Sequence, residues 1–419
     1  MKTGLVLGGG GARGAYEAGV ISFLRDELEP GLGRRLGLDV LSGTSVGAIN
    51  ACFLASTADE PAIQGRVLTE RWRSLRIGEV LRIGVGDVAR LLGEFLGRSP
   101  RSTEGQGGLV DPAGIRKIVL DAVRWGSIRR NLQSGAVTGL AVSATHVASG
   151  RTVTFVQRKE RGAPPWTHDR HFVVERAAVG PRHVLASAAI PMLFPAVRVG
   201  RSLYVDGGLR LSVPLSPALR LGAERVIVVS LRSAGPENAD RENERAYATA
   251  PFLFGKTLNA LLLDRTEQDL DRLQRINSIL EAGVEAFGSQ FGAVINRALI
   301  PHRNRPVQYV RNILVRPSRH IGALAAEYAR SPEFRRRGRG IAEHAVRYLA
   351  ERESRNSADL ASYLLFDGVF ADQLIEMGRA DARALGDAWA QFFSDAPVSA
   401  ADAAQLGQSA PRSTLAPTG

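Results

Sequence analysis

Residues 38–54, LDVLSGTSVGAINACFL, contain the turn that decides the fold of this 419-residue chain. Residues 38–42 are short and apolar, which predicts a buried strand, and residues 46–54 are apolar and small, which predicts a helix packed on a sheet. Between them Gly43-Thr44-Ser45-Val46-Gly47 forms a Gly-x-Ser-x-Gly. Flanking glycines allow a sharp turn that presents a serine hydroxyl at the carboxyl edge of the sheet. The motif alone is weak, and a plain strand-to-helix turn is the alternative.

A glycine-rich loop lies upstream of this turn. Residues 3–7 predict a first buried strand, and residues 8–14, GGGGARG, follow it directly. Three glycines satisfy Gly-x-Gly-x-x-Gly: Gly9, Gly11 and Gly14. A dinucleotide site with this pattern also needs an acid that closes the second strand, and Asp39 lies instead at the start of the next strand. We favour an oxyanion hole, in which consecutive glycine amides at a helix N-terminus converge on a developing negative charge.

The third motif is Asp206-Gly207-Gly208, which ends the strand predicted at residues 202–205. An Asp-Gly-Gly is ordinarily only a turn. At the end of an apolar strand, however, its carboxylate reaches an edge of the sheet, where a serine that follows another strand also lies. Residues 186–195, ASAAIPMLFP, precede it and predict a small-residue helix end with an apolar wall.

The order of the predicted elements indicates the α/β class. Two strands joined by the helix predicted at residues 14–28 form a parallel βαβ unit. A hairpin is predicted within residues 136–158, and further strands at residues 225–231 and 307–315. Helical patterns extend over three longer stretches, at residues 61–98, 251–299 and 321–393.

Taken together, these four stretches resemble the patatin-like phospholipases in content and order, over roughly residues 3–230. The resemblance implies a three-layer sandwich, with a mainly parallel central sheet flanked by helices. It also implies hydrolysis of lipid acyl esters through a Ser–Asp dyad, without a metal or other cofactor. Ser45 is then the nucleophile and Asp206 the base. Gly10 and Gly11 are the implied oxyanion-hole donors, and Arg13 occupies the basic position of the family in that loop.

The other glycines of the motifs shape the turns: Gly9, Gly14, Gly43, Gly47, Gly207 and Gly208. The sequence departs from the family pattern after the Asp-Gly-Gly. Many members have an asparagine there, shortly before a proline, whereas residues 209–214 read LRLSVP. The sequence therefore does not predict which residues hold Asp206 in position. Arg13 either braces its loop or adds positive potential to it.

The implied dyad contains no histidine. An aspartate has a pKa of about 3.9 in water and is a weak base at neutral pH, so Asp206 has to be partly desolvated to activate a serine. A closed, apolar acyl pocket would supply that desolvation. His183 is the histidine nearest to the apolar wall in the sequence, and we expect it on a helix surface. Its replacement should not abolish acyl transfer.

We expect three parts along the chain: a patatin-like acyl hydrolase domain at residues 1–320, a largely helical C-terminal extension at 321–395 and a disordered tail at 396–419. Within the first part, residues 251–299 are expected to form a helical lid or insertion. Residues 251–264 are apolar on most sides, which is typical of a buried core helix and also compatible with a lid that enters a lipid surface. Residues 99–108 predict a loop.

Composition narrows the class further. The single cysteine, Cys52, excludes an intramolecular disulfide framework and a cysteine-based metal site. The formal net charge is +12. This charge indicates either a solvated, arginine-rich surface or attraction to an anionic partner. Because the sequence carries no nucleic-acid-binding signature, an anionic membrane surface is a better hypothesis than nucleic acid.

The N-terminus has no signal-peptide pattern, and no apolar run reaches the roughly 18 residues of a membrane span. We therefore expect a cytoplasmic protein, with peripheral membrane binding as a hypothesis. The expected function is lipid acyl hydrolysis of the phospholipase or lysophospholipase type. Two alternatives stay open: an acyltransferase that uses the same acyl-serine, and a nucleotide-binding regulator built on the glycine loop. The sequence does not define the oligomeric state.

Overall fold

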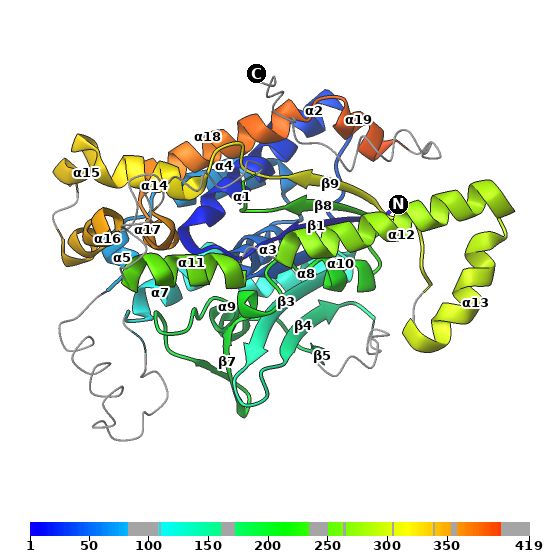
Figure 1. Cartoon of the computed structure of the whole chain (residues 1–419), viewed down its shortest axis with the longest axis horizontal. Helices are drawn as coiled ribbons and strands as arrows, with labels where there is room; N and C mark the ends of the chain where they lie inside the picture. The colour runs from blue at the N-terminus through cyan, green and yellow to red at the C-terminus, as the bar shows by residue number, and fades with distance from the viewer. Residues whose placement is uncertain are drawn as a thin grey trace, which may run out of the picture.

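The computed structural model describes residues 1–82, 108, 110–160, 172–233, 250–262, 265–303, 306–337, 340–352 and 358–394. Within these residues a nine-stranded sheet forms the centre, and helices cover both of its faces (Figure 1). The chain therefore has the α/β sandwich with a mainly parallel sheet that its motifs predict. A helical region follows the last strand, again as predicted.

The parallel part of the sheet brings the two glycine-containing turns together. Its strands are β1 (Thr3–Leu7), β2 (Val40–Thr44), β3 (Gly139–His146), β8 (Arg225–Val229) and β9 (Arg311–Val315). Their order is β3-β2-β1-β8-β9, and every neighbouring pair is parallel. Leu7 is in register with Gly43. The loops that follow β1 and β2 therefore leave the same edge of the sheet.

The sheet continues beyond β3 with a hairpin. β4 (Thr152–Arg158) pairs antiparallel with β3, which confirms the hairpin predicted within residues 136–158. β5 (Phe172–Arg176) pairs with β4 and forms the outer edge. The strands predicted at residues 225–231 and 307–315 are confirmed as β8 and as the shorter β9.

A second antiparallel pairing positions the Asp-Gly-Gly turn. β6 (Val197–Val199) pairs with β7 (Ser202–Asp206). β7 in turn pairs with the end of β3, where Asp206 lies opposite Ala144. On its other side β3 pairs with β2, and Thr44 is in register with Ser143. The aspartate therefore reaches the edge of the sheet at which β2 ends.

Alternating side chains along the strands pack into two apolar cores, one on each face of the sheet. Leu5 and Leu7 of β1 face the larger core, which includes α1 (Ala15–Ser22) and α3 (Val46–Ser56). Val6 faces the smaller core, which includes α10 (Leu215–Arg220). The loops at the carboxyl edge therefore emerge between two packed layers.

The other helical segments follow in chain order. Before β8 they are η1 (Gly11–Gly14), η2 (Phe23–Leu28), α2 (Glu29–Gly31), η3 (Pro61–Ile63), α4 (Gln64–Arg73), α5 (Ile77–Val80), α7 (Ala113–Ala122), α8 (Trp125–Ser134), α9 (Pro181–Ser187) and η4 (Gly207–Leu209). After β8 they are α11 (Ala250–Leu262), α12 (Arg265–Phe287), α13 (Phe291–Arg303), α14 (Ile321–Arg330), α15 (Pro332–Arg337), α16 (Ile341–Arg352), α17 (Asp359–Leu364), α18 (Gly368–Ala384) and α19 (Ala388–Phe393). The helical stretches predicted at residues 251–299 and 321–393 are thus confirmed where the structure describes them. Residues 83–98, most of the predicted loop at 99–108 and the predicted tail at 396–419 lie outside the described residues.

The contacts of α11 do not test whether this helix acts as a lid. It packs against α17 and η4, with Leu258 buried and Leu253 exposed. Its lid function stays a prediction. None of the described helices combines the length and the apolar character that a bilayer crossing requires.

Helix α18 packs directly on α1, at the opposite end of the chain. A Cβ added to Gly378 would strike the carbonyl oxygen of Tyr16, and one added to Gly19 would strike the carbonyl oxygen of Ile375. Absence of a side chain at these two positions lets the helix backbones approach closely. Because packed interiors tolerate little extra volume, this contact fixes the position of α18.

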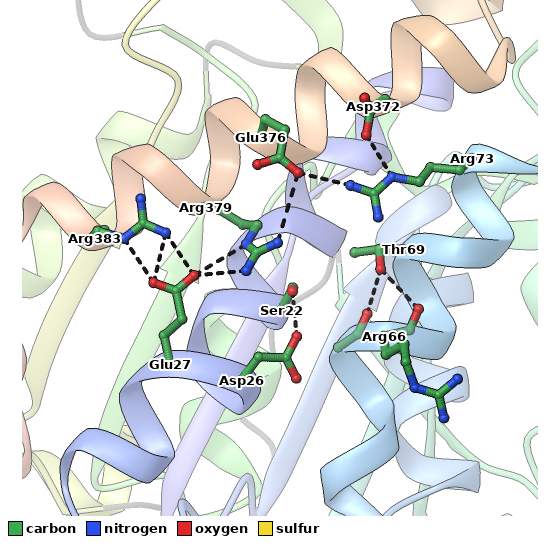
Figure 2. A network of polar contacts seen from close by, with 11 residues as sticks. Ser22, Asp26, Glu27, Arg66, Thr69, Arg73, Asp372, Glu376, Arg379 and Arg383 are labelled. Carbon is green, nitrogen blue, oxygen red and sulfur yellow. Dashed lines mark hydrogen bonds and ion pairs between the residues drawn. The ribbon is translucent and has the colours of Figure 1, made fainter.

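Ion pairs border the same contact (Figure 2). They join α18 to η2 and α4 as follows: Glu27 with Arg379 and Arg383, and Arg73 with Asp372 and Glu376. The side chains involved are partly or largely exposed, so each pair contributes little alone. The close backbone contact beneath them is the stronger constraint.

We predict that Gly378→Ala lowers the free energy of unfolding by about 1–3 kcal/mol, because the new methyl group overpacks the contact with Tyr16. Urea unfolding followed by circular dichroism measures this change. Gly126→Ala on α8 is the matched control, since no atom lies within 4 Å of its added Cβ. Equal stability of the two variants would contradict this description of the α1–α18 contact.

Candidate active site

Ser45 occupies a strained turn between β2 and α3. Its backbone has φ 56° and ψ −124°, a conformation that non-glycine residues rarely adopt and that is typical of functional sites. Gly47 makes the turn feasible, because a Cβ there would strike backbone oxygens of the β1 end, including that of Gly8 at 2.6 Å. The serine hydroxyl is nearly inaccessible to solvent, with 2% of the residue exposed.

Asp206 receives the Ser45 hydroxyl. Ser45 Oγ donates a hydrogen bond to Asp206 Oδ2 at 2.6 Å. The backbone N–H of Gly208 donates to Asp206 Oδ1 at 2.7 Å, so each carboxyl oxygen has a partner. The residue is fully buried. Burial raises the pKa of Asp206 to about 7, against the opposing effect of the hydrogen bonds from Ser45 and Gly208.

Ser187, the last residue of α9, makes two hydrogen bonds beside the Ser45–Asp206 pair. Its Oγ accepts a hydrogen bond from the Ser45 N–H at 2.8 Å and donates to the carbonyl oxygen of Ser143 at 2.6 Å. The Asp206 N–H donates to the carbonyl oxygen of Ala189 at 2.8 Å. The segment predicted as a small-residue helix end therefore holds the backbone of both Ser45 and Asp206. The sequence contained a signal for Ser187, the lone polar residue among residues 186–195.

The glycine loop lies beside Ser45. A Cβ added to Gly9 would lie 3.2 Å from Ser45 Cβ. The Gly9 amide donates to the carbonyl oxygen of Ser212 at 3.1 Å, whereas the amides of Gly10 and Gly11 donate to no acceptor among the described residues. Gly11 has φ 58°, in the left-handed region that favours glycine. Two adjacent amides beside the serine are thus available to bind an anion.

The remaining motif glycines lie in the same three turns. Gly14 ends η1, Gly43 lies in β2, and Gly207 and Gly208 begin η4 directly after Asp206. All four are buried. The structure therefore brings together the three motifs that the sequence singles out.

The Arg13 side chain is directed away from the Gly10 and Gly11 amides and toward α17. Its Nε donates to Ser362 Oγ at 2.8 Å, and its Nη2 lies 3.4 Å from Asp359 Oδ1. The guanidinium carbon lies 4.1 Å from the centroid of the Tyr363 ring. Of the two functions that the sequence left open, these contacts favour bracing of the loop. They also show that residues beyond 320 hold the loop in place.

Asp359 is the acceptor for more than one cation. Lys256 Nζ of α11 lies 3.0 Å from Asp359 Oδ2, and His320 Nε2 lies 3.8 Å from Asp359 Oδ1. Burial alone would raise the pKa of Asp359, but the charges of Arg13, Lys256 and His320 lower it below the usual value. This carboxylate is therefore ionised at neutral pH, and it links the glycine loop to α11 and α14.

Two residues that were candidates for other functions, His183 and Asp39, lie outside this site. His183 accepts a hydrogen bond from the Gly180 N–H at the start of α9 and packs against the Phe155 ring. Asp39 accepts a hydrogen bond from the Thr3 N–H at 2.7 Å. It precedes β2, so it lies at the opposite edge of the sheet from the glycine loop. This placement argues against its use in a dinucleotide site.

An apolar cavity of about 60 Å³ adjoins Ser45 and Gly11. Its walls come from α3, α4, α5, α7, the segment that follows α9 and the C-terminal segment, and they include Phe53, Trp72, Ile115, Ile190 and Phe366. Phe366 stacks on Trp72 with ring centroids 6.4 Å apart. The C-terminal contribution cannot be predicted from the sequence, because nothing in the local pattern of residues 359–366 relates them to a loop near residue 11.

The patatin-like phospholipase family matches residues 5–219 of this chain. The matched segment contains the glycine loop, Ser45, Ser187 and Asp206. The chain belongs to the patatin-like phospholipase family.

Three individual relatives are between 27% and 44% identical to this chain over the residues that match. The cGAMP-activated phospholipase of Pseudomonas aeruginosa is 31% identical over 209 residues, which are 49% of this chain and 52% of that protein. A lysophospholipase of Aspergillus terreus is 44% identical over 65 residues, which are 16% of this chain and 4% of that protein. An uncharacterized NTE family protein of Mycobacterium tuberculosis is 27% identical over 277 residues, 63% of this chain and 61% of that protein. The chain thus matches about half of the first relative and a small part of the second.

Among solved structures, VipD from Legionella pneumophila is similar with a TM-score of 0.32 and 15% sequence identity. The similarity covers 90% of this chain and 67% of that one.

We predict that Arg13→Met lowers the free energy of unfolding by about 3 kcal/mol, because it removes a cation from a buried carboxylate. Arg66→Met provides a matched control, since Arg66 pairs with Glu70 on the surface and its loss should cost less than about 1 kcal/mol. Urea unfolding compares the two. Similar losses in both variants would show that the Arg13–Asp359 pair does not stabilise the loop.

Proposed function

We propose that this chain is a lipid acyl hydrolase of the phospholipase or lysophospholipase type. The observation that carries the proposal is the 2.6 Å hydrogen bond from Ser45 Oγ to Asp206 Oδ2, formed next to two adjacent glycine amides. Membership of the patatin-like phospholipase family supports a lipid ester as substrate. The names of two relatives, a phospholipase and a lysophospholipase, support the same class.

In the first half of the reaction, Ser45 Oγ attacks the carbonyl carbon of the acyl ester, and its proton passes to Asp206 Oδ2. Collapse of the tetrahedral intermediate breaks the bond to the leaving alcohol, which takes the proton from Asp206. The acyl group is then esterified to Ser45. An aspartate with a pKa of about 7 suits this use, since a base is most effective when its pKa is close to the working pH.

The Gly10 and Gly11 amides are the donors that we propose for the oxyanion of the tetrahedral intermediate. Backbone donors that are already in place stabilise this charge without reorganisation. Arg13 is proposed to act through the loop, since its guanidinium is bonded to α17. Arg13 therefore contributes to the proposed reaction by positioning the glycine loop.

In the second half, a water molecule attacks the acyl carbon and gives its proton to Asp206, and Ser45 recovers that proton as the fatty acid leaves. An alcohol in place of water would give acyl transfer from the same intermediate. The apolar cavity beside Ser45 is proposed to hold the acyl chain. Its volume of about 60 Å³ is small for a long chain, so side chains of the wall have to move when such a chain binds. Binding to an anionic membrane surface stays a prediction from the net charge.

We predict that Ser45→Ala abolishes labelling by a fluorescent fluorophosphonate, and that Asp206→Asn reduces both labelling and ester hydrolysis by at least about 100-fold. In-gel fluorescence and release of fatty acid from lysophospholipid measure the two effects. His183→Ala is the matched control and should retain activity, because His183 accepts a hydrogen bond at the start of its own helix and packs against the Phe155 ring, away from Ser45. Labelling that survives Ser45→Ala would disprove the assignment of the nucleophile.

We predict that kcat/KM rises with pH up to about 7 and then stops rising, because Asp206 acts only when ionised and its pKa is about 7. Below that pH the rate should change about tenfold per pH unit. Hydrolysis of a soluble short-chain ester, measured between about pH 5 and pH 8, tests this. A rate that is flat across this range would contradict a buried aspartate as the base.

A further inference from the structure

A second fully buried carboxyl, that of Glu17, lies behind the glycine loop. Glu17 is on α1, which begins directly after η1. Its Oε2 accepts a hydrogen bond from Asn50 Nδ2 at 2.8 Å. Its Oε1 has no hydrogen-bond partner among the described residues. The reaction proposed above makes no use of this group.

Asn50 connects Glu17 to the nucleophile and to the cavity. It lies on α3, the helix that Ser45 begins, and its Nδ2 also donates to the carbonyl oxygen of Gly14 at 3.2 Å. Its Oδ1 accepts from Trp72 Nε1 at 3.3 Å. Asn50 and Trp72 both line the cavity beside Ser45. One amide therefore joins the end of the glycine loop, the nucleophile helix and the cavity wall.

Charged groups on the elements packed against α1 are bonded to other partners. In η1, η2, α4 and α18 the ion pairs are Arg13–Asp359, Arg25–Glu29, Arg66–Glu70, Arg73 with Asp372 and Glu376, and Glu27 with Arg379 and Arg383. Three further groups have other hydrogen bonds: Asp26 accepts from the Ser22 hydroxyl, Arg71 donates to the carbonyl oxygen of Asp121, and Asp381 accepts from the Tyr16 hydroxyl of α1. Helix α3 carries no charged residue. Several of these groups are drawn in Figure 2, where they bond within the surface network.

Resting on the function proposed above, we propose that Glu17 is a positioning residue for acyl hydrolysis, whose neutral carboxyl holds the Asn50 amide and thereby fixes α3 against the glycine loop. Burial raises the pKa of Glu17 to about 8, and the hydrogen bonds from Asn50 and from the backbone of Gly8 oppose this only in part. The group is accordingly protonated at neutral pH. Above about pH 8 it ionises and places a negative charge behind the amides that bind the oxyanion. That charge disfavours a second negative charge nearby, so the rate falls.

The test is the alkaline limb of kcat/KM for a soluble ester in the full-length chain. The parent should lose activity above about pH 8, whereas Glu17→Gln, which keeps the shape of the neutral acid, should retain neutral-pH activity and lose the alkaline fall. Glu70→Gln is the matched control for the same chemical change, since Glu70 is exposed and pairs with Arg66. It should keep the alkaline limb of the parent. A Glu17→Gln variant with an unchanged alkaline fall would overturn the proposal.

A second variant separates positioning from folding. Glu17→Leu removes the acceptor of the Asn50 amide, and we expect kcat to fall about tenfold in a variant that still folds, because a buried donor loses its partner. Circular dichroism establishes whether the variant folds. If Glu17→Leu folds and keeps the kcat and pH profile of the parent, Glu17 has no positioning function.

An independent readout distinguishes failure of this inference from failure of the proposed function. The pKa of Glu17 is raised from 4.5 to about 8, so the folded state binds this proton more tightly than the unfolded state does. The stability that it contributes is complete below about pH 4.5 and is lost as the pH rises toward 8. Urea unfolding between pH 5 and pH 9 should show a steeper loss for the parent than for Glu17→Gln. A parent that lacks esterase activity and labelling overturns the function, and identical unfolding slopes overturn the buried neutral acid.

Discussion

A buried carboxyl group that hydrogen-bonds with a serine, and that faces no cation among the described residues, constrains the whole site. Asp206 and Ser45 are 161 positions apart in the chain, yet their side chains meet at 2.6 Å. The contact depends on the antiparallel pairing of β7 with β3, which carries the aspartate to the carboxyl edge of parallel strands. It depends equally on Ser187, which fixes the serine backbone in its strained conformation. Such strain persists only where surrounding contacts determine the geometry.

The C-terminal segment provides several of those contacts, although the family match ends at residue 219. Asp359 holds Arg13 of the glycine loop, and Phe366 stacks on Trp72 in the cavity wall. Helix α18 lies on α1, the helix that continues from the same loop. The loop, the wall and the last helices therefore form one packed unit. A change in the C-terminal residues can alter the site without touching Ser45 or Asp206.

Much of the fold follows from local patterns in the sequence. Short apolar runs predict most of the strands, although not β5 and β6, and the parallel βαβ unit follows from their order. The meeting of Ser45 and Asp206 at one edge follows from the position of each at a strand end. Ser187 stands out locally as the lone polar residue among residues 186–195, but its hydrogen bonds with Ser45 and Ser143 depend on a distance in space and cannot be predicted from a spacing in the chain. Arg13 was placed in the correct loop, but its partner Asp359 lies far along the chain, and no local pattern encodes that ion pair.

Three buried acids show how environment sets the use of a single chemical group. Asp359 lies near Arg13, Lys256 and His320, which lower its pKa, and it stays charged as a structural link. Asp206 has hydrogen bonds but no cationic partner in the part of the chain that the structure describes, and burial raises its pKa to about 7, where a base can both gain and lose a proton. Glu17 has hydrogen bonds from Asn50 and from the backbone of Gly8, and burial raises its pKa to about 8. Positively charged partners separate Asp359 from the other two acids, because their attraction exceeds the cost of desolvating a carboxylate, whereas the hydrogen bonds to Asp206 and Glu17 offset only part of that cost. Removal of a partner from any of the three therefore shifts that acid toward its neutral form, and an added cation beside Asp206 would weaken it as a base.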